Sequence, residues 1–404
     1  TTVLNFISSF LCLHFHFHRQ WEYRFFRKAA KLPTKKSHPI FGHIFDVMVP
    51  PNRLLETLDR VRRENAPIFA VWIIVPVVMM TKPKHIEAIL GSPKHITKSL
   101  QYKPLKSWLG TGLLTSAGSK WHTHRKMLTP AFHFKTLENF VNVFSDKSQI
   151  LVEKLEKEIN AEHFDVVPYI SMCTLDIICE TAMGVEINAQ EHGHHSEYVN
   201  QANNITNEIA ERSAIPWLYL DFIYYRTQRG KLFRKYIKRM HTFTMESSYA
   251  KAIVQARECV NCYKLRDIVK KFSADGIQSD GSVIRQLMGT KKRLTFLDLL
   301  LETSNDGAVL TDEEVREEVD TFMFEGHDTT AAGISWTLQL LGSHLDVQDK
   351  VYMELEHIYL GSTRSCTMED LNKMKYLERV IKEALRLYPS VPIIGRRVQE
   401  DVIF

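Results

Sequence analysis

The sequence lacks a long apolar run at its start, and it lacks a strong charge of either sign. A membrane span needs about twenty apolar residues, whereas residues 3–17 are interrupted by Asn5, Ser8, Ser9, His14 and His16. The net charge is only +5, from 52 Lys and Arg against 47 Asp and Glu. A charge this small does not indicate a nucleic-acid-binding protein.

Cysteine is also scarce, and its six positions are scattered: Cys12, Cys173, Cys179, Cys259, Cys262 and Cys366. Such a distribution is not a disulfide framework and indicates a reducing compartment. The Cys-x-x-Cys at 259–262 has no second pair, so we interpret both residues as free thiols. The histidines at 192, 194 and 195 stand among polar residues, which favours a solvated loop over a metal site.

What is present is the composition of a globular protein with 44% hydrophobic and 25% charged residues, which excludes a disordered chain. Between Arg19 and Lys36 there are seven basic residues and one acidic residue, Glu22. The positive-inside rule makes this flank cytoplasmic. We interpret residues 1–31 as the remnant of a membrane anchor with its basic flank; a signal peptide or an interfacial helix is the alternative.

One long helix is predicted from Thr311 to about His344. Thr311 and Glu314 have the spacing of a capping box, and acidic residues fill the first turn, where the helix dipole favours them. Apolar residues recur at helical spacing on both sides of the centre. At about 1.5 Å per residue, a helix of this length crosses a large domain.

The centre of this helix, Glu325 to Gly333, contains glycines, threonines and ionisable side chains. A glycine inside a helix costs about 1 kcal/mol relative to alanine, and buried charge costs more unless it is paired. Local inconsistency of this kind is expected at functional sites. Small residues let a flat ligand approach the backbone, and threonine hydroxyls bonded to carbonyls open a helix locally. The alternative is a core helix with a glycine packing notch.

Other elements follow from local patterns. Residues 68–81 are rich in β-branched and aromatic side chains and predict a hairpin. Helices are expected from Lys84, between Phe140 and Ile187, and from Met368 to Tyr388, followed by a short strand at 390–395. Glycines within 247–294 predict an irregular loop, and an insertion is possible there.

Two spaced pairs could bind or support a cofactor. Trp121 and Arg125 share one helix face, where an indole N–H and a planar guanidinium could bind a carboxylate. A surface cation–π pair is the alternative. Glu383 and Arg386 are close enough to pair, and such pairs are usually solvated surface bridges.

These motifs, in this order, resemble those of the cytochromes P-450. Glu325-Gly326-His327-Asp328-Thr329-Thr330 is similar to the family's [Ala/Gly]-Gly-x-Asp-Thr-Thr, and the family also has Trp-x-x-x-Arg and Glu-x-x-Arg. The glutamate at the first position resembles the family-4 branch, the fatty-acid ω-hydroxylases. The resemblance runs from residue 32 to 404 and implies a mainly α fold with small β-sheets, in one cytochrome P-450 domain at 32–404, incomplete at its carboxyl end.

The resemblance implies roles for individual residues. Haem is the expected cofactor, with Trp121, Arg125 and Arg396 at its propionates, while Glu325 can form an ester to it. Asp328 and Thr329 are the expected catalytic pair, Asp328 relaying protons. In the family, the pair at 383 and 386 is buried and structural.

The resemblance also implies a setting for the enzyme. The expected substrates are long-chain fatty acids or similar apolar molecules. Electrons are expected from NADPH through NADPH–cytochrome P-450 reductase, at the cytosolic side of the endoplasmic reticulum membrane.

The family's iron ligand is a cysteine in Phe-x-x-Gly-x-x-x-Cys-x-Gly, carboxyl-terminal to the position matched by Phe404. None of the six cysteines has that setting, so no residue of this sequence is assigned as a metal ligand. Two hypotheses remain: a haem monooxygenase whose sequence continues beyond 404, or a truncated, non-catalytic helical remnant that binds haem weakly. The codons after Phe404 discriminate between them. The 404-residue chain is expected to lack the ferrous–CO Soret band of thiolate-ligated haem.

Overall fold

The computed structural model describes residues 29–402 except 30, 37, 39–41, 48, 66, 73–75, 133–136, 139, 193–196, 246–295, 298–299 and 301–309. Several expected features lie outside these residues: the apolar start of the chain, the 259–262 cysteine pair, the histidines at 194 and 195, and all of the segment 247–294. Within the described residues, no helix combines the length and the apolar character needed to cross a bilayer.

The chain forms two compact units. The N-terminal unit combines Thr1–Pro104, Thr206–Phe233 and Arg396–Phe404. Its elements are α2 (Ile44–Val47), α3 (Pro51–Glu64), β1 (Ile68–Trp72), β2 (Pro76–Met80), α4 (Pro83–Leu90) and α12 (Asp221–Tyr224). The helix α11 (Glu197–Ala214) is divided between the two units.

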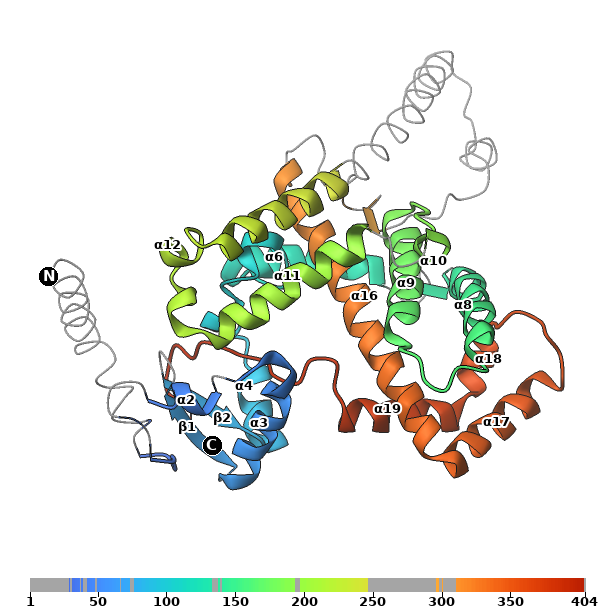
Figure 1. The fold of residues 1–404 in the computed structure, drawn as a ribbon, viewed down its shortest axis with the longest axis horizontal. Coiled ribbons are helices and arrows are strands. Elements are labelled where there is room, and N and C mark those ends of the chain that lie inside the picture. The colour runs from blue at the N-terminus through green and yellow to red at the C-terminus, as the bar shows by residue number, and fades with distance from the viewer. Residues whose placement is uncertain are drawn as a thin grey trace, which may run out of the picture. The chain divides into compact units, whose positions relative to one another are not determined.

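The central unit combines Leu105–Ile205 and Arg234–Gly395. Its elements are α5 (Lys106–Leu109), α6 (Gly118–Leu128), α8 (Val141–Leu155), α9 (Val167–Ile178), α10 (Ala189–His192), α16 (Asp312–Ser343), α17 (Leu345–Tyr359), α18 (Met368–Lys373) and α19 (Lys375–Leu387). Figure 1 shows α9 running alongside α16, the longest helix labelled there. The expected fold class, mainly helical with a small sheet, is confirmed.

The predicted hairpin is the two-stranded antiparallel sheet of β1 and β2. Its register places Ile68 opposite Met80 and Trp72 opposite Pro76. Proline lacks a backbone N–H and is tolerated as the first residue of a strand, where Pro76 stands. The following helix, α4, starts one residue before the predicted position, with Pro83 in its first turn, where a missing N–H leaves no gap in the helix ladder.

The predicted capping box of α16 is confirmed. The Thr311 hydroxyl accepts a hydrogen bond from the Glu314 backbone N–H at 3.2 Å, and the Glu314 carboxylate accepts one from the Thr311 backbone N–H at 3.0 Å. The Thr311 N–H, together with Lys120, lowers the pKa of Glu314 to about 2. The helix therefore begins where the sequence placed its start, and it continues without interruption to Ser343.

One side of the first half of α16 carries a buried carboxylate that binds two other segments. Glu318 has none of its surface exposed. One of its oxygens lies 2.6 Å from Nδ1 of the buried His124 on α6, and the other accepts the backbone N–H of Leu113 at 3.1 Å. Next to it, Glu317 accepts the Thr111 hydroxyl at 2.9 Å. These bonds hold α6 and the loop before it against α16.

A second buried group lies on another side of the same helix. Arg316 bonds to Asp320, whose other oxygen accepts the Thr244 hydroxyl at 2.7 Å. Burial raises the pKa of Asp320, although His241, Thr244 and Arg316 all act in the opposite direction. His241 also donates to the backbone carbonyl of Trp108 at 2.8 Å. Arg316 and Asp320 are thus paired within the core.

Gly326 marks the close approach of α9 to α16. A Cβ at this position would lie 2.7 Å from Cδ1 of Ile178. Gly326 therefore serves helix packing, as in the packing notch given above as the alternative interpretation. The space left by its missing side chain is filled by Ile178 of α9, so no flat ligand can approach the backbone there. Gly333 likewise faces Leu385 and Ser390.

The short strand predicted at 390–395 is wrong. These residues adopt no strand, and the first pairing beyond them is an isolated bridge between Lys98 and Arg396, with the Arg397 N–H on the Thr97 carbonyl at 2.8 Å. A strand is stabilised by a ladder of backbone hydrogen bonds to a neighbouring strand, and residues 390–395 belong to no such ladder among the described residues.

Two glycines of α16 provide a matched test of this packing. Gly326→Ala should lower the free energy of unfolding by about 1–3 kcal/mol, the range for overpacking a core. Gly342→Ala should raise it by up to about 1 kcal/mol, because nothing lies within 4 Å of a Cβ at Gly342. Chemical denaturation of both variants measures the two values. A neutral or stabilising Gly326→Ala would contradict the packing role.

Candidate active site

The polar centre of α16 stays helical, so the expectation that its threonines open the helix is wrong for this structure. Thr329 does bond back, its hydroxyl donating to the Glu325 carbonyl at 2.6 Å. A carbonyl oxygen has two lone pairs, so it can accept a side-chain donor without losing its helical N–H partner. The back-bond is therefore compatible with a continuous helix.

The backbone carbonyls of residues 323, 325, 327 and 329 each accept a hydrogen bond from a side chain. His327 Nδ1 donates to Met323 at 2.9 Å, and Thr329 to Glu325. The Thr174 hydroxyl of α9 donates to the His327 carbonyl at 3.1 Å, and the Ser390 hydroxyl donates to the Thr329 carbonyl at 2.7 Å.

The predicted site residues of α16 differ in exposure. Asp328 is exposed, whereas Thr329 and Glu325 are half-buried. Adjacent helix residues point about 100° apart, so Asp328 and Thr329 present a carboxylate and a hydroxyl on neighbouring sides of the helix. A carboxylate that reaches solvent and a hydroxyl beside it could exchange protons with a bound substrate or cofactor.

His327 is buried on a different side of the helix. Its ring lies 5.7 Å from that of Tyr198, edge to face. Burial lowers the pKa of His327, although its backbone hydrogen bonds and Asp328 favour the charged form. Residues two apart on a helix do not face each other, so the orientation of His327 argues against it as the hydrogen-bond partner of Glu325.

The predicted Trp-x-x-x-Arg pair lies on α6 as expected. Trp121 is half-buried with its ring 5.1 Å from that of His122, and Arg125 is exposed. Their helix is held against α16 by His124, which lies between Trp121 and Arg125 in the sequence at one of the variable positions of the motif. An indole N–H and an exposed guanidinium are suited to a ligand carboxylate.

The remaining predicted residues have a different setting. Arg396 is half-buried in the N-terminal unit, while the others belong to the central unit. Glu383 and Arg386 form the predicted pair through two hydrogen bonds of 2.7 Å. The expectation that this pair is buried is wrong here: the side chains are 56% and 66% exposed, since no described element covers that side of α19.

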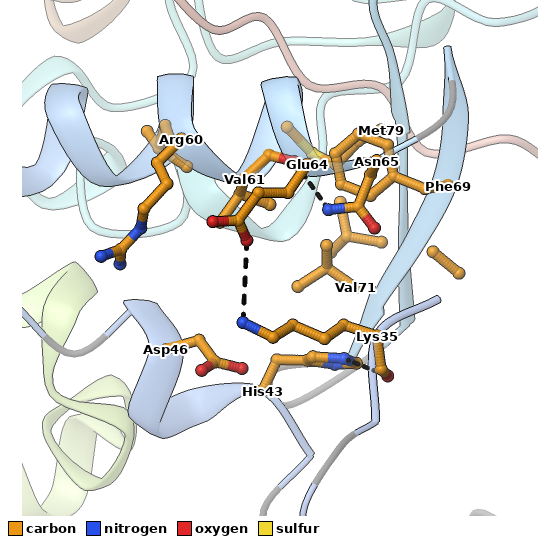
Figure 2. A pocket seen from close by; sticks show the side chains of 13 residues that line it. Lys35, His43, Asp46, Arg60, Val61, Glu64, Asn65, Phe69, Val71 and Met79 are labelled. Carbon is orange, nitrogen blue, oxygen red and sulfur yellow. Dashed lines mark hydrogen bonds and ion pairs between the residues drawn. The ribbon is translucent and has the colours of Figure 1, made fainter. Parts of the chain in front are cut away.

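A pocket among the described residues lies in the N-terminal unit. Figure 2 shows it between α3 and the hairpin, with Lys35 and Glu64 paired at 3.7 Å across it. His43 on its wall accepts the Trp72 N–H and donates to the Lys35 carbonyl. Its volume is about 70 Å³, which is too small for a haem, and none of the predicted site residues lines it.

The predicted site residues are suited to bind the edges of a haem, and they are less suited to coordinate its iron. Trp121 and Arg125 can bind carboxylates, and Glu325 offers a carboxylate on the facing helix. Among the described cysteines, Cys173 and Cys179 are buried, and burial raises the thiol pKa, that of Cys173 to about 12. A thiol of this kind is not poised as an iron-binding thiolate.

A mainly helical chain with an acid and an alcohol at adjacent positions of its longest described helix, and Trp-x-x-x-Arg on another helix, fits what the resemblance to the cytochromes P-450 implies. Comparison with known proteins agrees, since the family model described as Cytochrome P450 matches residues 32–404. This chain belongs to the cytochrome P450 family, in its family-4 branch, and its enzyme class is that of a cytochrome P450 monooxygenase.

The relatives are similar over most of this chain. It is 44% identical over 391 residues to cytochrome P450 4V2 of Homo sapiens, covering 95% of this chain and 69% of that protein. It is 43% identical to cytochrome P450 4V2 of Rattus norvegicus with the same coverage. With cytochrome P450 4c3 of Drosophila melanogaster it shares 42% identity over 388 residues, 94% of this chain and 69% of the relative.

Four residues around the site were not predicted: His124, Glu318, Thr174 and Ser390. Their partners lie between 61 and 205 positions away in the sequence. Glu318 gave no local signal either, because it stands among the charged residues Arg316, Glu317 and Asp320.

The buried His327 generates a prediction for pH. Because its pKa is lowered below the usual 6.5, the unfolded chain binds a proton first as the pH falls. The free energy of unfolding should therefore decrease from about pH 6.5 down to the lowered pKa of the folded state. Thermal denaturation at pH 7.5 and 5.5 should give a smaller loss for His327→Gln than for the wild type.

The exposed His122 provides the control. His122→Gln should retain the pH dependence of the wild type. An equal loss of stability in His327→Gln and in the wild type would contradict the assigned state of His327.

Proposed function

We propose that this protein hydroxylates long-chain fatty acids or similar apolar molecules at their terminal carbon. The observation that carries the proposal is Glu325, half-buried in α16 one turn from the pair Asp328 and Thr329. A glutamate at this position of the motif resembles the family-4 branch, where it can form an ester to the haem. An ester to a haem methyl group would neutralise it and fix the haem in place.

A fixed haem supports the choice of the chain terminus. The terminal C–H bond is stronger than those of the adjacent methylene, so attack at the terminus needs a geometry that excludes the weaker bond. Haem, when bound, supplies the oxygen chemistry. The protein contributes the position of the substrate relative to the haem, for which a rigid attachment through Glu325 leaves the least freedom.

The other site residues have complementary roles in this proposal. Trp121, Arg125 and Arg396 would bind the haem propionates. Asp328 would pass protons from solvent, which its exposure permits. The Thr329 hydroxyl would orient the proton at the reacting oxygen.

The proposal includes a membrane setting and an electron donor. The basic flank between Arg19 and Lys36 supports anchoring of a cytosolic domain at the endoplasmic reticulum membrane. Electrons would come from NADPH through NADPH–cytochrome P-450 reductase, docking on the basic, membrane-proximal side.

The ester is tested by denaturing the haem-loaded enzyme in acid and separating haem from protein by chromatography. Part of the haem should remain attached to the wild type, and Glu325→Ala should release it and shift oxidation from the ω toward the ω−1 carbon. Glu313→Ala, which removes an exposed carboxylate three turns earlier in the same helix, should retain the haem. Complete extraction from the wild type would rule out the ester.

The role of Thr329 is tested by coupling. Thr329→Ala should consume NADPH with less product per NADPH, because the proton is no longer delivered at the right atom, and Thr329→Ser should restore much of the coupling. Thr330→Ala, at the exposed neighbouring position, should behave as the wild type. Unchanged coupling in Thr329→Ala would count against its role.

A further inference from the structure

The carbonyls of α16 around Asp328 have more donors than a helix requires. In a continuous helix, the carbonyl of residue 327 accepts the N–H of Ala331, and that of residue 329 accepts the N–H of Gly333. Each of the two also accepts a hydroxyl from a segment outside the helix: Thr174 on α9 and Ser390 after α19.

The second donor changes what happens when a backbone bond of this helix breaks. A buried carbonyl that loses its only partner carries a desolvation penalty. With a hydroxyl still bound, the carbonyls of His327 and Thr329 remain satisfied after Ala331 or Gly333 swings away. Opening is then less unfavourable at these two carbonyls than it would be at a carbonyl whose only donor is the helical N–H.

We propose that Thr174 and Ser390 are positioning residues that let α16 open its backbone ladder around Asp328 and Thr329 without orphaning a carbonyl. The proposal deepens the proposed function and rests on it for its purpose: the opened ladder would give the acid–alcohol pair the freedom to move a proton. The hydroxyls hold the carbonyls of residues 327 and 329 in place while the amides beyond them are released.

The two hydroxyls are not equivalent. Ser390 has one recorded acceptor, at 2.7 Å. The single proton of Thr174 is shared between the His327 carbonyl and the Ser171 carbonyl of its own helix, each at 3.1 Å. Ser390 should therefore have the larger effect, and it should act on Gly333, whereas Thr174 should act on Ala331.

Amide hydrogen exchange resolved to single residues tests the proposal in the haem-free 404-residue chain. Ser390→Ala should slow exchange of the Gly333 amide by roughly three- to tenfold, the range expected for one net hydrogen bond. Thr174→Val should slow the Ala331 amide by a smaller factor. Each variant is the control for the other, because neither should affect the other's amide.

The direction of the effect separates positioning from packing. If the hydroxyls only stabilise the packing of α9 and the 390 segment, their removal should speed exchange across α16. Faster or unchanged exchange at Gly333 in Ser390→Ala would overturn the proposal. Thr174→Ser and Ser390→Thr keep a hydroxyl and should restore wild-type exchange, and denaturant unfolding of each variant excludes a change in global stability as the cause.

This experiment fails separately from the proposed function. It needs no haem, reductase or fatty acid, so the measured amide exchange rates test the opening of α16 independently of which substrate the enzyme oxidises. In the haem-loaded enzyme, Ser390→Ala should lower coupling while Ser390→Thr restores it. Wild-type coupling together with slowed exchange would show that opening occurs but does not serve proton delivery.

Discussion

The carboxylate of Glu318 is fully buried and accepts hydrogen bonds from His124 on α6 and from the backbone of Leu113. Removing one partner of a buried hydrogen bond leaves the other group unsatisfied, which costs about 1–3 kcal/mol and more for a charged group. This carboxylate therefore holds α6, the loop before it and α16 in one arrangement. The Trp121–Arg125 helix and the helix with Glu325 and Thr329 lie where they do because of it.

The two halves of α16 are held by different kinds of interaction. Its first half uses paired charges to fix the position of the helix, and its centre uses side-chain donors on alternate carbonyls. Gly326 brings α9 close enough for Thr174 to reach the His327 carbonyl. Several features that looked unfavourable in the sequence thus have partners: His327 and Thr329 bond within α16, and Gly326 packs against α9.

The sequence predicted the elements whose signals are local. The capping box needs only Thr311 and Glu314, and the hairpin needs only a local density of β-branched and aromatic residues, so both were found. The geometry of the Glu383–Arg386 pair also follows from helical spacing, but its exposure does not, since that depends on what packs against α19. The missing strand at 390–395 has the same cause, because a strand exists only with a neighbour.

Gly326 and Glu318 show the other limit of sequence reasoning. A glycine in a helix is equally consistent with a ligand or with a neighbouring helix, and only the position of Ile178 decided between them. Glu318 and His124 are 194 residues apart, and no local pattern connects them. The family motifs identified the candidate residues, while the contacts that position those residues required the structure.

The central claim is that the haem lies against the middle of α16 and the helix α6. Comparing amide hydrogen exchange of the haem-free and haem-loaded protein tests it most directly. The account predicts that haem protects Gly118–Leu128 and the stretch from about Thr321 to Gly333, with little change in α17 and α18. Protection confined to other elements, or no protection of α6, would contradict it.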